Sequence, residues 1–208
     1  MSSTLEPLTP DRRRQQTRDH LLAAAAQVFA ERGFHGATLD VVAAAAGFSK
    51  GAVYSNFKNK EDLFLAILET GYSRELDSLR ATLDASEEPA EARLADFLPL
   101  IVEGETDLLP PGVWAVLYME FALFAMRNPV ARHKLAEIDD ANISAVAELI
   151  SEGTTGRKDP GAIKREARIV EALFRGISLM RVLDPAAVDE ALMEAALSFV
   201  TTALTSEA

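Results

Sequence analysis

The sequence predicts an all-α fold of about nine helices. An N-terminal three-helix domain is expected over residues 1–59 and a C-terminal helical bundle over residues 60–208. Apolar residues recur at three- and four-residue steps along most of the chain, and the alternation typical of strands is scarce. Capping residues, prolines and glycines divide this pattern into segments of helical length. The alanine runs at 23–26 and 43–46 are good helix formers.

The first expected helix carries a single apolar stripe. Its members lie at positions i, i+1, i+4, i+7 and i+8: Leu21, Leu22, Ala25, Val28 and Phe29. Gly33 follows and suits the left-handed position that often ends a helix. The stripe therefore predicts an amphipathic helix that stops near Gly33.

Two short helices are expected next. Thr38 can cap a helix over 39–46, which Gly47 ends, and Ser49 can cap a third helix of about residues 50–56. A tight turn between two short helices makes them cross steeply, so the third helix should project from the surface. It would be about 10 Å long, and a DNA major groove roughly 12 Å wide can accept such a helix.

Later helix starts are marked by capping residues and prolines. Asn59, followed by two acids in the first turn, opens a long fourth helix. A capping side chain precedes a proline at three further places, and a similar start is expected at Glu88-Pro89. These three are Asn128-Pro129, Asp159-Pro160 and Asp184-Pro185.

Charge is distributed unevenly along the chain. The net charge is −11, but residues 11–60 hold eight basic and four acidic side chains. A basic head on an acidic body favours approach of a polyanion to the head. The chain has no cysteine, no secretion signal is recognised, and the longest apolar run, 113–126, is too short to span a bilayer. We therefore expect a cytoplasmic protein without contact to a membrane.

The segment from Gly33 to Leu63 resembles the tetracycline-repressor (TetR) family. The matching residues are Gly33-Phe34 with Thr38, Ala46-Gly47, Ser49 with Gly51, Tyr54 and Phe57, and then Lys60-Glu61-Asp62-Leu63. The resemblance covers about residues 12–70 and implies a dimeric, ligand-controlled transcriptional regulator. Beyond this segment the chain is similar to the family only in length and number of helices. At Ser55-Asn56 it departs from the His or Trp that family members often carry after the tyrosine, so no operator preference follows.

The resemblance implies DNA contacts residue by residue. Phosphate contacts are expected from Thr38, Tyr54, Lys58 and Lys60. Base contacts are expected from Ser49, Lys50, Ala52 and Ser55, where Lys50 could donate to guanine and Ala52 could touch a thymine methyl. Gly51 permits close approach of the backbone. Arg12, Arg13 and Arg14 are expected to form a flexible arm that reaches the backbone or the minor groove.

The run 113–126 is apolar on all sides and predicts a central helix. With residues of the preceding helix it could line a pocket for a small, largely apolar effector, as the resemblance implies; an ordinary packed core is the alternative. Candidate pocket residues are Phe97, Ile101, Trp114, Leu117, Tyr118, Glu120, Phe121, Phe124 and Arg175. Since a buried carboxylate needs a partner, Glu120 could pair with a cationic ligand or with Arg175, or it could reach solvent.

The last two helices repeat apolar residues at helical steps. Such stripes could pack against their copies in a homodimer as a four-helix bundle, which the resemblance favours, or could close the core of a single subunit. Candidate interface residues are Ile169, Leu173, Ile177, Val188, Leu192, Ala195 and Phe199.

No catalytic constellation, metal site or cofactor site is recognised, so an enzyme is not expected. The expected partners are double-stranded operator DNA, an effector and a second copy of the chain. A repressor released from a near-palindromic operator is the leading interpretation, and an activator cannot be separated from it. The alternative is an all-α ligand-binding or scaffold protein that does not bind DNA.

Overall fold

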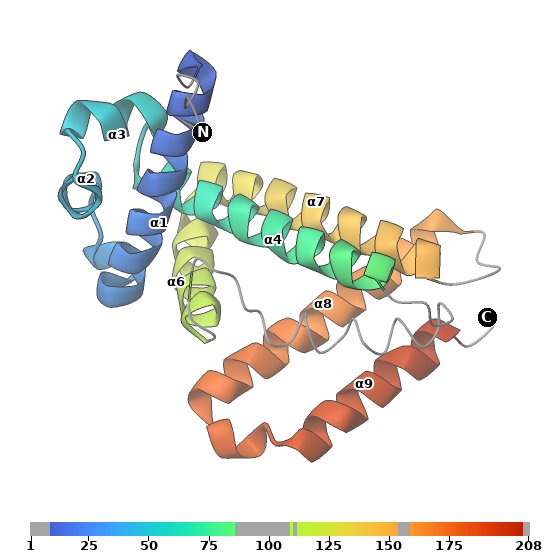
Figure 1. The fold of residues 1–208 in the computed structure, drawn as a ribbon. Helices are drawn as coiled ribbons and strands as arrows, with labels where there is room; N and C mark the ends of the chain where they lie inside the picture. Colours follow the sequence, from blue (N-terminus) through green and yellow to red (C-terminus); the bar gives the residue numbers. More distant parts are fainter. Residues whose placement is uncertain (1–8, 86–108, 110–111, 154–158, 206–208) are drawn as a thin grey trace, which may run out of the picture. The chain divides into compact units, whose positions relative to one another are not determined.

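The computed structural model describes residues 9–85, 109, 112–153 and 159–205. Within these ranges the chain forms eight α-helices, one 3₁₀ helix and no β-strand (Figure 1), which confirms the all-α prediction. The elements are α1 (Pro10–Gly36), α2 (Leu39–Ala46), α3 (Lys50–Asn56), α4 (Lys60–Ala85), α6 (Val113–Arg127), α7 (Pro129–Gly153), α8 (Pro160–Leu183), the 3₁₀ helix η1 (Pro185–Ala187) and α9 (Glu190–Thr205). The expected start at Glu88-Pro89 and the candidate residues Phe97 and Ile101 lie outside the described residues.

The helices of the N-terminal part begin at the predicted caps. The Thr38 hydroxyl accepts from the Val41 amide at 3.3 Å, and the Ser49 hydroxyl accepts from the Ala52 amide at 3.2 Å. The Asn59 side chain accepts from the Asp62 amide at 2.7 Å. Each bond satisfies an amide that has no partner within its own helix, so these starts are fixed by local chemistry.

Two of three predicted cap-proline starts begin α-helices. Asn128 accepts from the amides of the first turn of α7, and Asp159 accepts from those of α8. The third prediction is corrected, because Asp184-Pro185 opens only the short η1, without a side-chain cap. The last helix is capped by Asp189, whose carboxylate accepts from the Leu192 amide at 2.9 Å.

Two glycines with positive φ end the first two helical segments. Gly33 has a φ of 67°, which breaks the regular helix of α1 where the sequence predicted a stop. Gly47 has a φ of 69° in the left-handed region and closes α2. Because L side chains rarely adopt this conformation, glycine is favoured at both positions.

The chain divides into two compact units, residues Met1–Ile67 and Leu68–Ala208. The division falls inside α4, later than the expected boundary at 59/60. The first two turns of α4 belong to the first unit because Phe64 packs edge-on against Phe29 and Phe34, with ring centroids 5.3 and 5.5 Å apart. The first unit is therefore a three-helix head closed by the beginning of α4.

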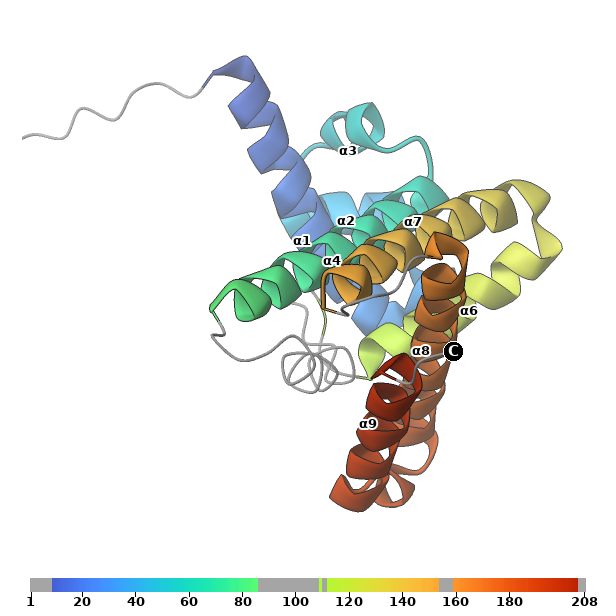
Figure 2. The same ribbon diagram turned by 90° about the vertical axis from the view of Figure 1, so that its right-hand side faces the viewer.

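The second unit has its core where α7, α8 and α9 meet. Phe174, Val170 and Ile150 are buried there together with Val200 of α9. Helices α8 and α9 run antiparallel and are joined through η1, as both views show (Figures 1 and 2). This core is built from the apolar stripes that periodicity predicted.

Helix α6 corrects the expectation of a central helix buried on all sides. Leu117, Phe121 and Ala125 are buried, and α6 packs against α7 and α8. Along its other side lies an exposed apolar stripe: Val116, Met119, Leu123 and Met126. The sequence alone does not indicate this exposed face, because apolar residues occur at surface positions as well as in the core.

Candidate functional site

Helix α3 presents a polar face on an apolar base. Val53 and Phe57 are buried and fix the helix to the head. Lys50, Gly51 and Ser55 are exposed, and the ring of Tyr54 is 54% exposed. A seven-residue helix of this kind offers donors and a bare backbone to a groove while its other side stays packed.

Local hydrogen bonds stabilise this helix. Besides the Ser49 cap, the Ser55 hydroxyl and the Asn56 amide both donate to the carbonyl oxygen of Ala52, at 2.9 and 2.8 Å. These bonds use short-range partners only, so they form with the helix itself. The exposed side chains therefore extend from a helix that is stabilised locally.

Lys50 lies in an ion pair that the sequence did not indicate. Its ammonium donates to Oδ2 of Asp40, in the first turn of α2, over 2.5 Å. This hydrogen bond raises the pKa of Lys50, which keeps the side chain protonated. The partners are ten positions apart in the sequence and lie in different helices. The pair therefore bridges α2 and α3 across the turn between them.

Lys58 and Lys60 have different surroundings. Lys58 is exposed, whereas the Lys60 ammonium donates to the carbonyl oxygens of Phe34 and His35, at 3.0 and 3.2 Å. It also lies 4.7 Å from the centre of the Phe34 ring. Lys60 thus binds the end of α1, a role that its position in the family motif did not reveal.

The arginines near the N-terminus correct the prediction of a flexible arm. Arg12, Arg13 and Arg14 lie in the first turns of α1 and are exposed. Thr9 caps that helix by accepting from the Arg12 amide, and Pro10 occupies its first position. A threonine cap before a proline is itself a helix start signal, so this start could have been found from the sequence.

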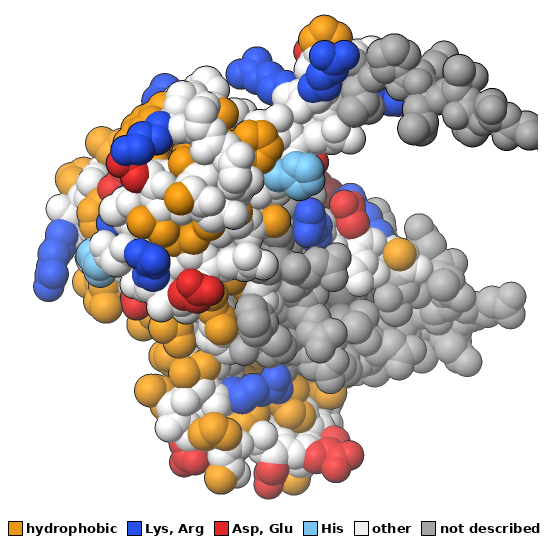
Figure 3. Space-filling model, turned by 60° about the vertical axis from the view of Figure 1, so that its left-hand side comes forward, with side chains coloured by type: hydrophobic (Ala, Val, Ile, Leu, Met, Phe, Trp, Pro, Cys, Tyr) orange, Lys and Arg blue, Asp and Glu red, His pale blue; other side chains and the backbone are white. Residues whose placement is uncertain are grey.

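Arg18 is one of the eight basic residues of the segment 11–60. Its guanidinium lies 4.7 Å from the centre of the Phe57 ring, so it packs on the residue that anchors α3. Figure 3 views the side on which α1, α2 and α3 lie. Lys and Arg side chains stand out from it at several separate places, with Asp and Glu side chains between some of them.

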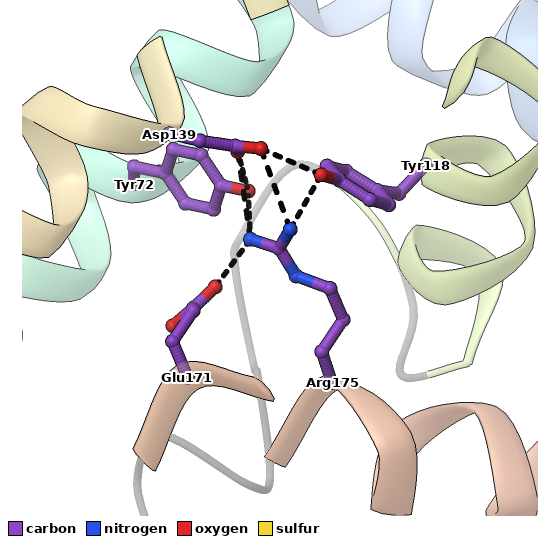
Figure 4. Close-up of polar contacts among 5 residues, drawn as sticks. All are labelled: Tyr72, Tyr118, Asp139, Glu171 and Arg175. Carbon is purple, nitrogen blue, oxygen red and sulfur yellow. Dashed lines mark hydrogen bonds and ion pairs between the residues drawn. The ribbon is translucent and has the colours of Figure 1, made fainter. Parts of the chain in front are cut away.

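The second unit contains a polar cluster centred on Arg175 of α8 (Figure 4). The guanidinium donates to the hydroxyls of Tyr72 and Tyr118 and is paired with Asp139 and Glu171. These four partners come from α4, α6, α7 and α8. One side chain therefore ties four helices together.

Hydrogen bonds connect the members of this cluster to one another. Asp139 accepts from the Tyr118 hydroxyl at 2.7 Å and from the Tyr72 hydroxyl at 3.3 Å. Arg175 lies 2.5 Å from Glu171, and its guanidinium sits 4.2 Å from the centre of the Tyr118 ring. Burial raises the pKa of both tyrosines, so both remain donors at neutral pH.

Glu75 of α4 lies at the edge of this cluster. Burial, and then the negative charge of Glu171, raise its pKa from 4.5 to about 8, while Arg175 acts in the opposite direction. Among the described residues, Glu75 forms no hydrogen bond or ion pair. It is a carboxyl group that the sequence analysis did not single out, because only its tertiary neighbours distinguish it.

Of the partners that the sequence suggested for Glu120, the structure contradicts Arg175. Arg175 forms its ion pairs with Asp139 and Glu171 instead. The other described pocket candidates are distributed between core and half-buried positions. Leu117 and Phe121 are buried, whereas Trp114, Tyr118, Glu120, Phe124 and Arg175 are half-buried.

Trp114 packs closely on the backbone of α4. A Cβ added at Gly71 would lie 3.1 Å from the edge of the Trp114 ring, and the ring of Tyr72 stands edge-on to it at 6.0 Å. The aromatic end of α6 thus rests on a glycine in the same helix that carries Tyr72 and Glu75. Gly71 could not be assigned this role before its neighbour was known.

The candidate dimer residues do not share one environment. Ile169 and Phe199 are 61% and 66% exposed, and Ala195 is exposed. Leu173 and Val188 pack against the subunit's own core, and Leu192 is half-buried. Ile177 is a correction, because it is only 4% exposed and belongs to that core.

The two units match two family models. Residues 21–67 match "Bacterial regulatory proteins, tetR family", and residues 90–205 match "BetI-type transcriptional repressor, C-terminal". The chain belongs to the TetR family. Its head is thereby a DNA-binding helix-turn-helix, and this TetR-family protein is a transcriptional regulator. The family resemblance expected from the sequence is confirmed.

Individual relatives agree with this assignment. The uncharacterised HTH-type transcriptional regulator YfiR of Bacillus subtilis is 28% identical over 72% of this chain and 71% of its own. The HTH-type transcriptional repressor DhaR of a Mycobacterium species is 32% identical, but the match covers 43% of this chain and 46% of DhaR. The match thus covers less than half of either chain.

A solved structure supports the fold over nearly the whole chain. The fatty acid degradation regulator FadR of Bacillus halodurans superposes with a TM-score of 0.69 at 20% identity. The superposition covers 94% of this TetR-family chain and 97% of that one. In the described part of the chain, no helix combines the length and the apolar character that crossing a bilayer requires.

Proposed function

We propose that this TetR-family regulator is a homodimeric repressor that a small molecule releases from a near-palindromic operator. The observation that carries the proposal is the exposed polar face of α3, held on buried Val53 and Phe57. Two such helices in a dimer would read half-sites about one helical turn apart.

We divide the proposed DNA contacts into base contacts and phosphate contacts according to the exposure and the chemistry of each side chain. We assign base contacts to Ser49, Lys50, Ala52 and Ser55, and close backbone approach to Gly51. Phosphate contacts are assigned to Thr38, Tyr54 and Lys58, and to the helical Arg12, Arg13 and Arg14. Lys60 is left out of this set, because its ammonium already binds two carbonyl groups of α1.

We place the effector beside α6, against Trp114, Tyr118, Phe121 and Phe124. This side of the helix joins apolar rings to the polar cluster, a combination that suits a largely apolar ligand with one polar group. Such a group would compete for the Tyr118 hydroxyl or for Arg175, both half-buried. Because Tyr72 of α4 shares these bonds, ligand binding would alter what holds α4.

Release of DNA would then follow from linkage. A ligand that binds better to a conformation in which α4 is displaced also favours that conformation, and with it any state in which the heads fit DNA poorly. Helix α4 supports this idea because it continues without a break from Lys60, in the head, to Tyr72 and Glu75. We infer that the protein acts in the bacterial cytoplasm, where its DNA target lies.

The test is selection of bound fragments from genomic DNA by the full-length protein, followed by titration at several salt concentrations. We expect a near-palindromic sequence among the selected fragments and an affinity that falls steeply as salt rises. Genes beside the selected site then suggest small molecules to screen for release. Absence of salt-dependent DNA binding would replace this proposal by the scaffold alternative, and DNA binding that no such compound reverses would remove the effector.

A further inference from the structure

The ion pair between Lys50 and Asp40 joins the two helices of the helix-turn-helix. It connects the first residue of α3 to the first turn of α2, with 2.5 Å between Nζ and Oδ2. The side chains of Lys50 and Asp40 are 67% and 48% exposed. The pair therefore stands at the surface that the proposed function turns toward DNA.

Such a pair contributes little to folding. Exposed ion pairs are weakened by water and by salt, and holding a long lysine side chain in one rotamer costs entropy. Its more important effect is on the direction of the ammonium. A lysine released from Asp40 would be drawn to the nearest phosphate, and phosphate contacts carry no sequence information.

Asp40 also brings negative charge to a surface that must approach a polyanion. Taken alone, this charge opposes binding to any DNA sequence. It leaves Lys50 with two further N–H groups that can donate to an acceptor such as guanine O6 or N7. The Asp40 carboxylate therefore lowers the affinity for DNA of any sequence, and it holds the Lys50 ammonium in one position.

We propose that Asp40 is a specificity-determining positioning residue, which holds the Lys50 ammonium over a base and away from phosphate. The inference rests on the base-reading role given to Lys50 above. It requires that Asp40 act through Lys50 and not by touching the DNA itself.

The experiment compares full-length wild-type protein with Asp40→Asn, Asp40→Glu, Lys50→Ala and the double variant Asp40→Asn/Lys50→Ala. Asp19→Asn is the matched control, because it removes the same charge from the same head, while within the described residues its carboxylate accepts from Gln15 in α1. Each protein is titrated on the selected operator, on operators with single base-pair changes, and on unrelated DNA. The titrations are repeated over a range of salt concentrations.

We expect Asp40→Asn to reduce the preference at one base pair about fivefold, as loss of one exposed charge contact would. The salt dependence should steepen by about 0.9 in log–log slope, because the freed lysine neutralises one more phosphate. Lys50→Ala should lose preference at that same base pair. Asp40→Glu should retain most of the preference, and Asp19→Asn should leave it unchanged.

The double variant decides how Asp40 acts. In the Lys50→Ala background, Asp40→Asn should raise affinity for all sequences alike, because a repelling charge is lost, but should leave the base preference unchanged. A further change in preference would mean that Asp40 contacts DNA itself. If Asp40→Asn only lowers the melting temperature, its role is structural and the inference is overturned. Wild-type preference in Lys50→Ala would instead contradict the base-reading role of Lys50, which is a failure of the proposed function.

Discussion

Two lysines that were both expected to contact phosphates have different surroundings in the head. Lys58 is exposed, whereas Lys60 donates to the Phe34 and His35 carbonyls at the end of α1. We predict that Lys58→Ala weakens binding to all DNA sequences and reduces the salt slope by about 0.9, since one phosphate contact is lost. Lys60→Ala should lower the free energy of unfolding by about 1–3 kcal/mol, because two carbonyl groups lose a charged donor.

Each variant serves as the control for the other. Thermal or urea unfolding measures stability, and titration at several salt concentrations measures the slope. The assignment fails if Lys60→Ala reduces the slope as Lys58→Ala does while its stability remains that of the wild type.

Glu75 makes stability depend on pH. Its pKa rises from 4.5 to about 8 in the folded state, first through burial and then through Glu171. A raised carboxyl pKa contributes stability that is complete below pH 4.5 and is lost as the pH rises to about 8. We predict that Glu75→Gln, measured by urea unfolding from pH 5 to pH 8.5, loses much less stability with rising pH than the wild type.

Glu69→Gln is the matched control, because it removes a carboxyl group from an exposed position of the same helix. Its pH dependence should follow the wild type. Equal slopes for Glu75→Gln and the wild type would show that Glu75 is ionised across this range. The charged groups that face Glu75 are Glu171 and Arg175, so these must stay unchanged in both variants.

The sequence predicts those features of single residues that depend only on short-range chemistry. Ser49, Thr38 and Asn59 cap the helices they precede because a cap needs only amides three residues away. The Arg175 cluster could not be found this way. Tyr72 and Arg175 are 103 positions apart, and nothing near either residue indicates the other. For the same reason the sequence could not indicate that Arg175 pairs with Asp139 and Glu171 and not with Glu120.

Two glycines of the helix-turn-helix are favoured for different physical reasons. Gly47 ends α2 with a φ of 69°, whereas Gly51 lies inside α3, where an added Cβ would meet only Ser49 Oγ at 3.8 Å. We predict that Gly47→Ala lowers the free energy of unfolding by about 1–2 kcal/mol, the cost of a left-handed L-residue. Gly51→Ala should leave the fold intact or stabilise it by up to about 1 kcal/mol.

DNA binding should separate the same two variants. If the backbone at Gly51 approaches the DNA, its new methyl group should weaken operator binding about tenfold, a cost of roughly 1.4 kcal/mol. The folded fraction of Gly47→Ala should bind as the wild type does. Full operator affinity in Gly51→Ala would mean that this part of α3 stays clear of the duplex.

The helix boundaries were predictable wherever one residue and its neighbours determine them. The stops at Gly33 and Gly47 and the starts at Pro129 and Pro160 follow from single residues and their neighbours. Helix α6 was harder, because its exposed stripe differs from its buried side only in what packs on it. Periodicity predicts a helix, but in a helix that is apolar on all sides it does not indicate which side is buried.

For the whole molecule, the dimer decides whether the proposed function is possible. Two heads must be joined to read a near-palindromic site, and affinity for two half-sites far exceeds affinity for one. Exposed Phe199 of α9 and Ile169 of α8 are large apolar side chains on the last two helices. Periodicity predicted these stripes, but it could not distinguish Ile177, which the subunit uses for its own core.

We predict that Phe199→Asp converts the dimer to a monomer, because a buried unpaired carboxylate at the interface is strongly unfavourable. Light scattering after size-exclusion chromatography measures the mass, and titration measures operator binding, which should fall at least tenfold while the helical content stays unchanged. Met126→Asp is the matched control, since Met126 is also a large apolar side chain and is 71% exposed on α6. It should remain dimeric. A monomer from Met126→Asp together with a dimer from Phe199→Asp would move the interface to α6, where the exposed stripe of Val116, Met119, Leu123 and Met126 lies.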